Sequence, residues 1–157
     1  MGVPDDQLHA EIAARLRAHG LRVTAPRIGV VMALERTPHA DADTVARQVR
    51  KSLGAVSTQA VYDVLHALTE ARLVRRIEPA GSPARYETRV GDNHHHMVCR
   101  ECGVVADVEC AGEAVPCLNP GPTHGFVVDE AEVTFWGTCA RCHTSESTET
   151  SLIKENG

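Results

Sequence analysis

The sequence predicts an α+β fold in two parts, a helical N-terminal half and a strand-rich C-terminal half. Apolar residues recur at helical spacing up to about residue 71, whereas short alternating pieces typical of strands occur at residues 96–99, 104–108 and 126–136. The composition changes around residues 89–93. We therefore predict a first domain over 1–88, a hinge over 89–93, a second domain over 94–143 and a disordered tail over 144–157.

Four amphipathic helices are expected in the first half. Thr24, Asp41 and Ser57 are good N-caps, and each stands before a stretch with helical periodicity. Gly20 and Gly54 suit the ends of the first and third helices. The expected helices run over residues 5–19, 25–36, 41–52 and 57–71. The side chains expected to be buried by the third helix and its end are those of Val45, Val49 and Leu53.

A β-hairpin is expected after these helices. Residues 73–78 and 84–88 have extended character and flank residues 79–83, which contain two prolines and a glycine. Three helices packed around a fourth, presented helix and followed by a hairpin make a winged helix. We predict that this domain binds DNA, although the same elements could serve protein contact, because a fold does not fix a function.

The charge distribution supports a nucleic-acid contact in the first half only. Residues 1–92 hold 13 Arg and Lys against 11 Asp and Glu, whereas residues 93–157 hold 3 against 10. No apolar run approaches the roughly 20 residues of a membrane helix, and the N-terminus does not resemble a signal peptide. We therefore expect a cytoplasmic protein without membrane contact, in which cysteines serve as metal ligands or redox thiols.

Four of the six cysteines form two Cys-x-x-Cys pairs, Cys99 with Cys102 and Cys139 with Cys142. Each pair is expected in a turn after a strand, where it can present two thiolates to one ion. Four tetrahedrally placed thiolates favour zinc, so we predict a structural Zn(II) site. The alternative is a set of buried or redox-active cysteines.

A second group of donors consists of nitrogen and oxygen atoms. His94, His95 and His96 precede the first cysteine, with Glu87 upstream and Asp107 downstream. In an extended strand, His94 and His96 point to one face and His95 to the other. Imidazoles with carboxylates suit Fe(II), Mn(II), Zn(II) or Ni(II), so we predict a second metal site; an exposed polar strand is the alternative.

Five motifs occur in order along the chain. They are LRVTAPR at 21–27, HADADTV at 39–45, AVYDVL at 60–65, HHHMVCRECG at 94–103 and the closing Cys-x-x-Cys at 139–142. In this order they resemble the ferric uptake regulator family of bacterial metal-responsive repressors, over nearly the whole of residues 8–143. The resemblance implies a winged-helix domain joined by a hinge to an α/β dimerisation domain, in a homodimer that binds double-stranded operator DNA when loaded with metal.

The resemblance also implies a regulatory metal site. Its ligands would be His39, Glu87, His94, His96 and Asp107. His39 belongs to the DNA-binding domain and the others to the hinge and the second domain, so filling the site would favour one arrangement of the dimer. Fe(II) is the expected ion, with Mn(II), Ni(II) or Zn(II) as alternatives.

DNA contacts are expected from the presented helix and from two arginines before the second helix. The candidates are Arg22, Arg27, Ser57, Gln59 and Tyr62. A half-buried core position is the alternative for Tyr62. Many family members have Arg after this Tyr, whereas Asp63 stands here, so the operator preference is expected to differ from the usual one.

Two features indicate the peroxide-responsive branch of the family. Peroxide-sensing relatives typically have Asp at the position of Asp107, and the segment 92–96 with the insertion that carries Cys110 and Cys117 resembles regulators associated with catalase-peroxidase. These two cysteines could be packed thiols or an oxidisable pair. Iron, zinc or nickel sensing without a peroxide response is the alternative.

A further metal site of the family would involve His95 and His124. Ala131 stands where another histidine ligand would be expected, which argues against this site.

Two functions from other classes are alternatives to a repressor. A zinc-dependent hydrolase would need a carboxylate base beside its metal-bound water, but no His-Glu-x-x-His helix is present and the nearby carboxylates are better placed as ligands. A zinc-bearing scaffold of the transcription machinery would use the winged helix to bind protein. We therefore expect no enzymatic activity and no small-molecule substrate.

Overall fold

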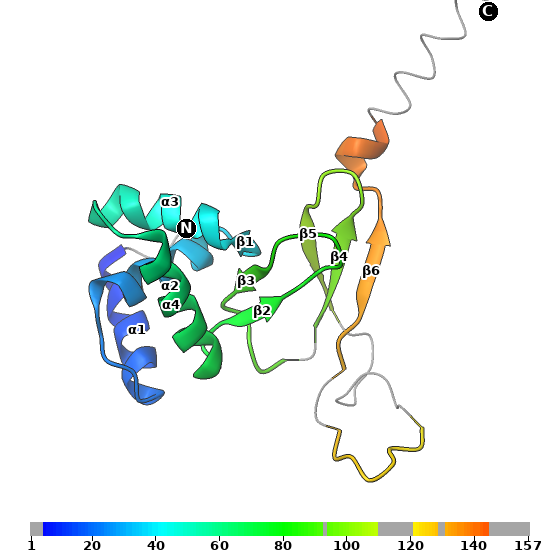
Figure 1. Ribbon diagram of the computed structural model, residues 1–157, viewed down its shortest axis with the longest axis horizontal. Helices are drawn as coiled ribbons and strands as arrows, with labels where there is room; N and C mark the ends of the chain where they lie inside the picture. Colours follow the sequence, from blue (N-terminus) through cyan, green and yellow to red (C-terminus); the bar gives the residue numbers. More distant parts are fainter. Residues whose placement is uncertain (1–4, 93, 110–120, 129–130, 145–157) are drawn as a thin grey trace, which may run out of the picture. The chain divides into compact units, whose positions relative to one another are not determined.

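The computed structural model describes residues 5–92, 94–109, 121–128 and 131–144. The chain divides into two compact units, Met1–Gly91 and Asp92–Gly157 (Figure 1). Among the described residues, no helix is both long enough and apolar enough to cross a bilayer.

The first unit contains four helices and three short strands. In chain order they are α1 (Asp5–Ala18), α2 (Ala25–Arg36), β1 (Ala40–Asp41), α3 (Ala42–Leu53), α4 (Thr58–Glu70), β2 (Arg75–Ile77) and β3 (Arg85–Glu87). The predicted caps are confirmed, because Thr24, Asp41 and Ser57 each accept a hydrogen bond from the backbone N–H three residues later.

The helices of the first unit enclose one hydrophobic core. Leu16, Leu34, Leu65 and Leu68 come from three different helices and are fully buried in it. Leu53 does not join them as expected, since it is 40% exposed at the last residue of α3. It lies instead over α2, where a Cβ at Gly29 would come within 3.2 Å of its Cδ1 atom.

The hairpin of the first unit, β2 and β3, forms a three-stranded sheet together with β1. Its order is β1-β3-β2, and both pairings are antiparallel, with Arg76 opposite Tyr86 and Ala40 opposite the same tyrosine. The strand β1 was not expected from the sequence and is only two residues long. This strand connects the hairpin to the start of α3, so the wing and the helical layer form one body.

The second unit is built on a three-stranded sheet. Its strands are β4 (His95–Cys99), β5 (Val105–Val108) and β6 (Thr134–Gly137), in the order β5-β4-β6 (Figure 1). The central strand is antiparallel to β5 and parallel to β6.

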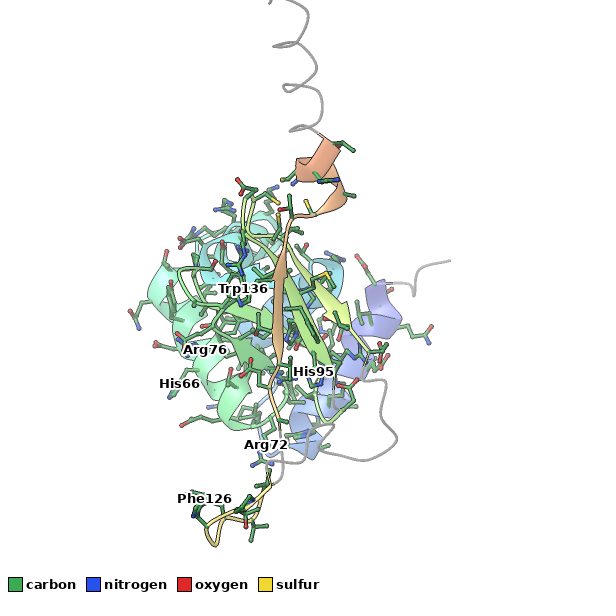
Figure 2. All side chains as sticks on the ribbon, turned by 90° about the vertical axis from the view of Figure 1, so that its right-hand side faces the viewer. His66, Arg72, Arg76, His95, Phe126 and Trp136 are labelled. Carbon is green, nitrogen blue, oxygen red and sulfur yellow. The ribbon has the colours of Figure 1, made fainter. Side chains whose placement is uncertain are left out.

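The expectation of a strand piece over residues 126–136 was largely wrong. Of the residues described from 126 onward, only 134–137 form a strand, whereas Phe126 lies in a loop and is 76% exposed (Figure 2). The preceding turn has positive φ angles at Gly121, His124 and Gly125, which interrupt extended backbone. Thr144, the first residue of the tail predicted over 144–157, ends a short helical turn instead, and residues 145–157 lie outside the described residues, as do Cys110 and Cys117.

Candidate metal centres and nucleic-acid interface

The four paired cysteines lie together in the second unit. Cys99 ends β4 and Cys102 follows in the turn, while Cys139 comes after β6 and Cys142 lies in the short helical turn 140–144. Their four Sγ atoms all lie within 4.8 Å of one another. Gly103, at φ +69°, reverses the chain after the first pair. The parallel pairing of β4 with β6 therefore brings together two pairs that are 36 residues apart in sequence.

Protonation of these thiols differs from one to the next. Backbone N–H groups of Cys102 and Cys139 lower the pKa of Cys99 to about 6. Hydrogen bonds from the neighbouring thiols, Cys139 first, raise the pKa of Cys142 to about 12. Because four adjacent thiolates repel one another, the cluster favours a divalent cation that neutralises them and displaces their protons. This donor set suits tetrahedral zinc.

In the first unit, His39 and Glu87 form a second pair of donors. The Nε2 atom of His39 lies 2.9 Å from Oε2 of Glu87, and the carboxylate is only 1% exposed. His39 directly precedes β1 and has a φ angle of 60°, which is uncommon for a residue other than glycine. Glu87 ends the partner strand β3, so it belongs to the first unit and not, as expected, to the hinge or the second domain. Both donors are thus held by the small sheet of the wing.

In the second unit, His94 and His96 converge on one carboxylate. Their Nε2 atoms each lie 3.8 Å from Oδ1 of Asp107, which is the cross-strand neighbour of His96. Both imidazoles are fully buried, and their ring centroids are 4.8 Å apart. Imidazole and carboxylate donors at the ends of two strands can hold a transition-metal ion.

Asp92, which is not among the predicted ligands, contacts one of them. Its Oδ1 atom lies 2.6 Å from Nδ1 of His94. This contact orients the ring so that Nε2 faces Asp107, as carboxylates beside metal-binding histidines commonly do. The sequence signal for this contact is the presence of a carboxylate two residues before the histidine.

His95 does not lie with its two neighbours. Its side chain is buried, and its cross-strand neighbour is Val108 rather than Asp107. His124 lies in the exposed turn of the loop 121–128. Among the residues that the structure describes, no group of three or more metal donors contains either histidine.

The exposed face of α4 carries the candidate DNA contacts. Ser57 caps the helix, and Gln59 and Tyr62 are exposed, with Tyr62 at 45%. The opposite face is buried in the core through Val61 and Leu65. This orientation leaves the helix available for the major groove.

Tyr62 also borders a shallow pocket of about 90 Å³ between α4 and the wing. The pocket is lined in addition by Asp41, Ala42, Asp43, Pro83, Ala84 and Tyr86. The tyrosine lies at the edge of this pocket, about half exposed, and is not part of the hydrophobic core of the first unit.

Arginines at the start of α2 and at the end of α3 are candidates for contacts with DNA phosphates. Arg27 donates from its guanidinium to the carbonyl of Arg22 at the start of α2, over 2.8 Å. Arg50, at the end of α3, donates to the carbonyl of Val56 over 2.9 Å and also to the hydroxyl of Thr58. Cations beside a presented helix suit contacts with DNA phosphates.

A winged-helix unit followed by a small β unit with a four-cysteine cluster and imidazole–carboxylate groups defines the class of metal-dependent transcriptional regulators. The model of the ferric uptake regulator family matches residues 18–132. The chain belongs to this family. It is a transcriptional regulator that binds metal and not an enzyme, which removes the hydrolase alternative.

Individual relatives agree with this assignment. The transcriptional regulator FurA of Mycobacterium tuberculosis (strain H37Rv) is 57% identical over 137 residues, which cover 87% of this chain and 93% of the relative. Ferric uptake regulation protein 2 of Mycolicibacterium fortuitum is 56% identical over 142 residues, covering 88% and 97%.

Solved structures share the fold. A zinc uptake regulator in complex with zinc and DNA superposes with a TM-score of 0.67 at 20% identity, covering 93% of this chain and 99% of the other. Proteins of this family bind DNA.

Proposed function

We propose that this protein is a homodimeric repressor that binds operator DNA when its regulatory site holds Fe(II) or Mn(II). Loss of the metal, or oxidation by peroxide, releases the DNA. The observation that carries the proposal is that each unit presents a separate group of imidazole and carboxylate donors. His39 and Glu87 do so in the first unit, and His94, His96 and Asp107 in the second.

One metal ion bound to both groups would join the two units in a single arrangement. In the first unit, its ligands are fixed to the wing through β1 and β3, and β1 leads directly into α3. The arrangement of α4 and the wing on DNA would therefore depend on the metal. To shift such an equilibrium from 1:99 to 99:1, the metal must bind the DNA-competent state about 10⁴-fold more tightly than the other state.

The four-cysteine cluster has a different task in this proposal. All its ligands belong to the second unit, and it joins the ends of β4 and β6. We assign to it a structural Zn(II), because thiolates hold zinc firmly whereas imidazole and carboxylate donors suit an ion that exchanges. The two sites therefore separate folding from sensing.

The homodimer is supported by an apolar face of the second sheet. Met97 on β4 and Phe135 on β6 are direct neighbours in register, and with Val104 they are 46–49% exposed. A second copy of the chain that covered this face would bury these side chains, which is favourable at roughly 25 cal/mol per Å² of apolar surface. Because its target is DNA, the proposed dimer acts in the cytoplasm.

The peroxide response is supported by Asp107 and by the likeness to FurA. Bound Fe(II) would supply the reducing electron for peroxide, and a ligand imidazole would be the group oxidised. His94 and His96 are the candidates, because both are buried beside Asp107. The likeness to a ferric uptake regulation protein favours an iron-responsive repressor without peroxide sensing as the second candidate.

Anaerobic DNA binding tests the proposal. The zinc-loaded protein would be incubated with promoter DNA and with Fe(II), Mn(II), Ni(II) or Zn(II) in turn, each with and without peroxide. We expect binding with Fe(II) and Mn(II) and loss after peroxide with Fe(II) alone, since Mn(II) does not reduce peroxide in this way. Binding that is equal with and without added metal would contradict the regulatory site. Fe(II)-dependent binding that survives peroxide would select the second candidate.

A further inference from the structure

We propose that Asp63 reads the operator sequence by accepting a hydrogen bond from the exocyclic amino group of a base in the major groove, with cytosine as the preferred base. This inference rests on the proposed function, because it requires α4 to lie in that groove. Asp63 would then help to discriminate between DNA sequences. Residues that contact only the DNA backbone position the protein but do not read the sequence.

The position of Asp63 on α4 suits a base contact. Gln59, Asp63, His66 and Glu70 are exposed and recur every three or four residues, so they form one stripe of the helix. The opposite stripe is buried in the core. Asp63 lies in the N-terminal half of the helix, which is the part that contacts base edges in helix-turn-helix proteins. Figure 2 shows His66 projecting from the same helix away from the core.

The negative charge of Asp63 makes a phosphate contact by this side chain unfavourable. The sequence of the helix, TQAVYDVLHALTE, contains no Arg or Lys, and its charged residues are Asp63 and Glu70. Phosphate contacts would fall to arginines on other elements, such as Arg50 at the end of α3. A carboxylate that enters the groove is repelled by phosphates and gains free energy only where it meets a hydrogen-bond donor.

The side chain of Asp63 is already oriented in the free protein. The amide Nε2 of Gln59 donates a 2.8 Å hydrogen bond to its Oδ1 atom, one helical turn away. The bond occupies one carboxylate oxygen, so that Oδ2 is the atom assigned to the base. Ordering both side chains before binding lowers the entropy lost on contact with DNA.

The hydrogen-bonding groups of the bases in the major groove determine which base Asp63 would prefer. Cytosine presents an amino donor in the major groove without a hydrogen-bond acceptor on the same base, and adenine presents an amino donor next to N7. Guanine and thymine present carbonyl acceptors, which repel a carboxylate. One such contact should discriminate cytosine from guanine or thymine by about 5- to 20-fold, within the range for direct base contacts.

The test uses the full-length chain loaded with zinc and Mn(II), at one fixed salt concentration. The wild type would first select its site from a random duplex library, and each position would then be replaced by all four bases. Asp63→Asn keeps the shape but adds a donor, and Asp63→Ala removes the group. Glu70→Gln is the matched control, because it removes an equal charge from the same stripe about 10 Å further along the helix.

We expect the wild type to prefer cytosine at one position of each half-site. Asp63→Asn and Asp63→Ala should lose that preference by about 5- to 20-fold while the other positions are unchanged, and Glu70→Gln should retain it. An unchanged base profile in both Asp63 variants, or an equal gain of affinity for every sequence, would overturn the inference and leave the repressor standing. Failure of the wild type to bind any duplex would overturn the proposed function and this inference with it.

Discussion

At the scale of single residues, Asp41 connects β1, to which it belongs, with α3 and with β3. Its Oδ1 atom accepts a 2.7 Å hydrogen bond from the backbone N–H of Thr44 at the start of α3. Its backbone pairs with Arg85 of the wing, and the two side chains are 3.9 Å apart. Burial raises the pKa of Asp41, but the hydrogen bonds from Thr44 and the nearby arginine charges outweigh it, so the pKa lies below its usual value.

Replacing Asp41 therefore tests the connection between the wing and α3. Asp41→Ala should lower the free energy of unfolding by about 0.5–2 kcal/mol at neutral pH, the usual loss for an N-cap. The pKa is lower in the folded state, so this stabilisation is present above the unfolded-state pKa, near 4, and disappears as the pH falls through the folded value. Urea unfolding of wild type and variant, compared at each pH, measures the difference.

Asp41→Asn provides the control for this prediction, because asparagine caps helices about as well as aspartate. It should retain most of the stability at neutral pH but lose the acid-dependent part. Equal stability of Asp41→Ala and wild type at neutral pH would contradict the role of Asp41 as a cap.

At the scale of elements, the zinc cluster connects β4 to β6. The aromatic ring of Trp136 on β6 also lies near this cluster, with the guanidinium of Arg100 5.3 Å from its centroid. Cys99 and Arg100 follow one another at the end of β4, so loss of the cluster would release both contacts.

Cys99→Ser should therefore release zinc and unfold the second unit with its dimer interface. The reason is the size of the metal contribution, about 10–16 kcal/mol of apparent folding free energy at a structural zinc site. Zinc content, sedimentation velocity and the fluorescence of Trp136, the single tryptophan of the chain, measure the three consequences. Cys110→Ser, at a thiol outside the Cys-x-x-Cys pairs, should leave all three unchanged. A dimeric, unaltered Cys99→Ser protein would disprove the structural role.

The elements that could be predicted from the sequence are those fixed by local signals. The helices and the caps at Thr24 and Ser57 depend on residues a few positions apart, and they were predicted to within one or two residues. The strand β1 is too short for a periodic pattern. The strand expected over 126–136 was largely wrong, because the apolar residues 126–128 belong to a loop that follows a turn with positive φ angles at His124 and Gly125. Its last residues do form the start of β6.

The candidate sites also contain some features that local sequence signals predict and others that they do not. The cysteine pairs were recognisable because their spacing is itself the chemical signal, and the structure brings their sulfur atoms together. The orientation of His94 by Asp92 depends on the path of the chain between them, and the pairing of Gln59 with Asp63 depends on side-chain rotamers. Neither path nor rotamers can be derived from composition or spacing.

At the scale of the whole molecule, the proposed repressor function depends on two metal sites with separate roles. The cysteine cluster lies within the second unit, whereas the proposed regulatory ligands are divided between the two units. Damage to the first site should destroy the dimer. Damage to the second should leave a folded dimer that no longer responds to metal, because the coupling free energy between metal and DNA is lost.

The most direct test is His96→Ala, measured for zinc content, oligomeric state and metal-dependent operator binding in the same preparation. His9→Ala, at an exposed histidine of α1, controls for the loss of an imidazole that is neither a proposed ligand nor part of the proposed DNA-binding helix. We predict that His96→Ala keeps its zinc and its dimer but binds the operator no better with Fe(II) or Mn(II) than without, whereas His9→Ala still responds to metal. A His96→Ala protein that retains the full metal response, or one that loses zinc and dissociates as Cys99→Ser does, would contradict it.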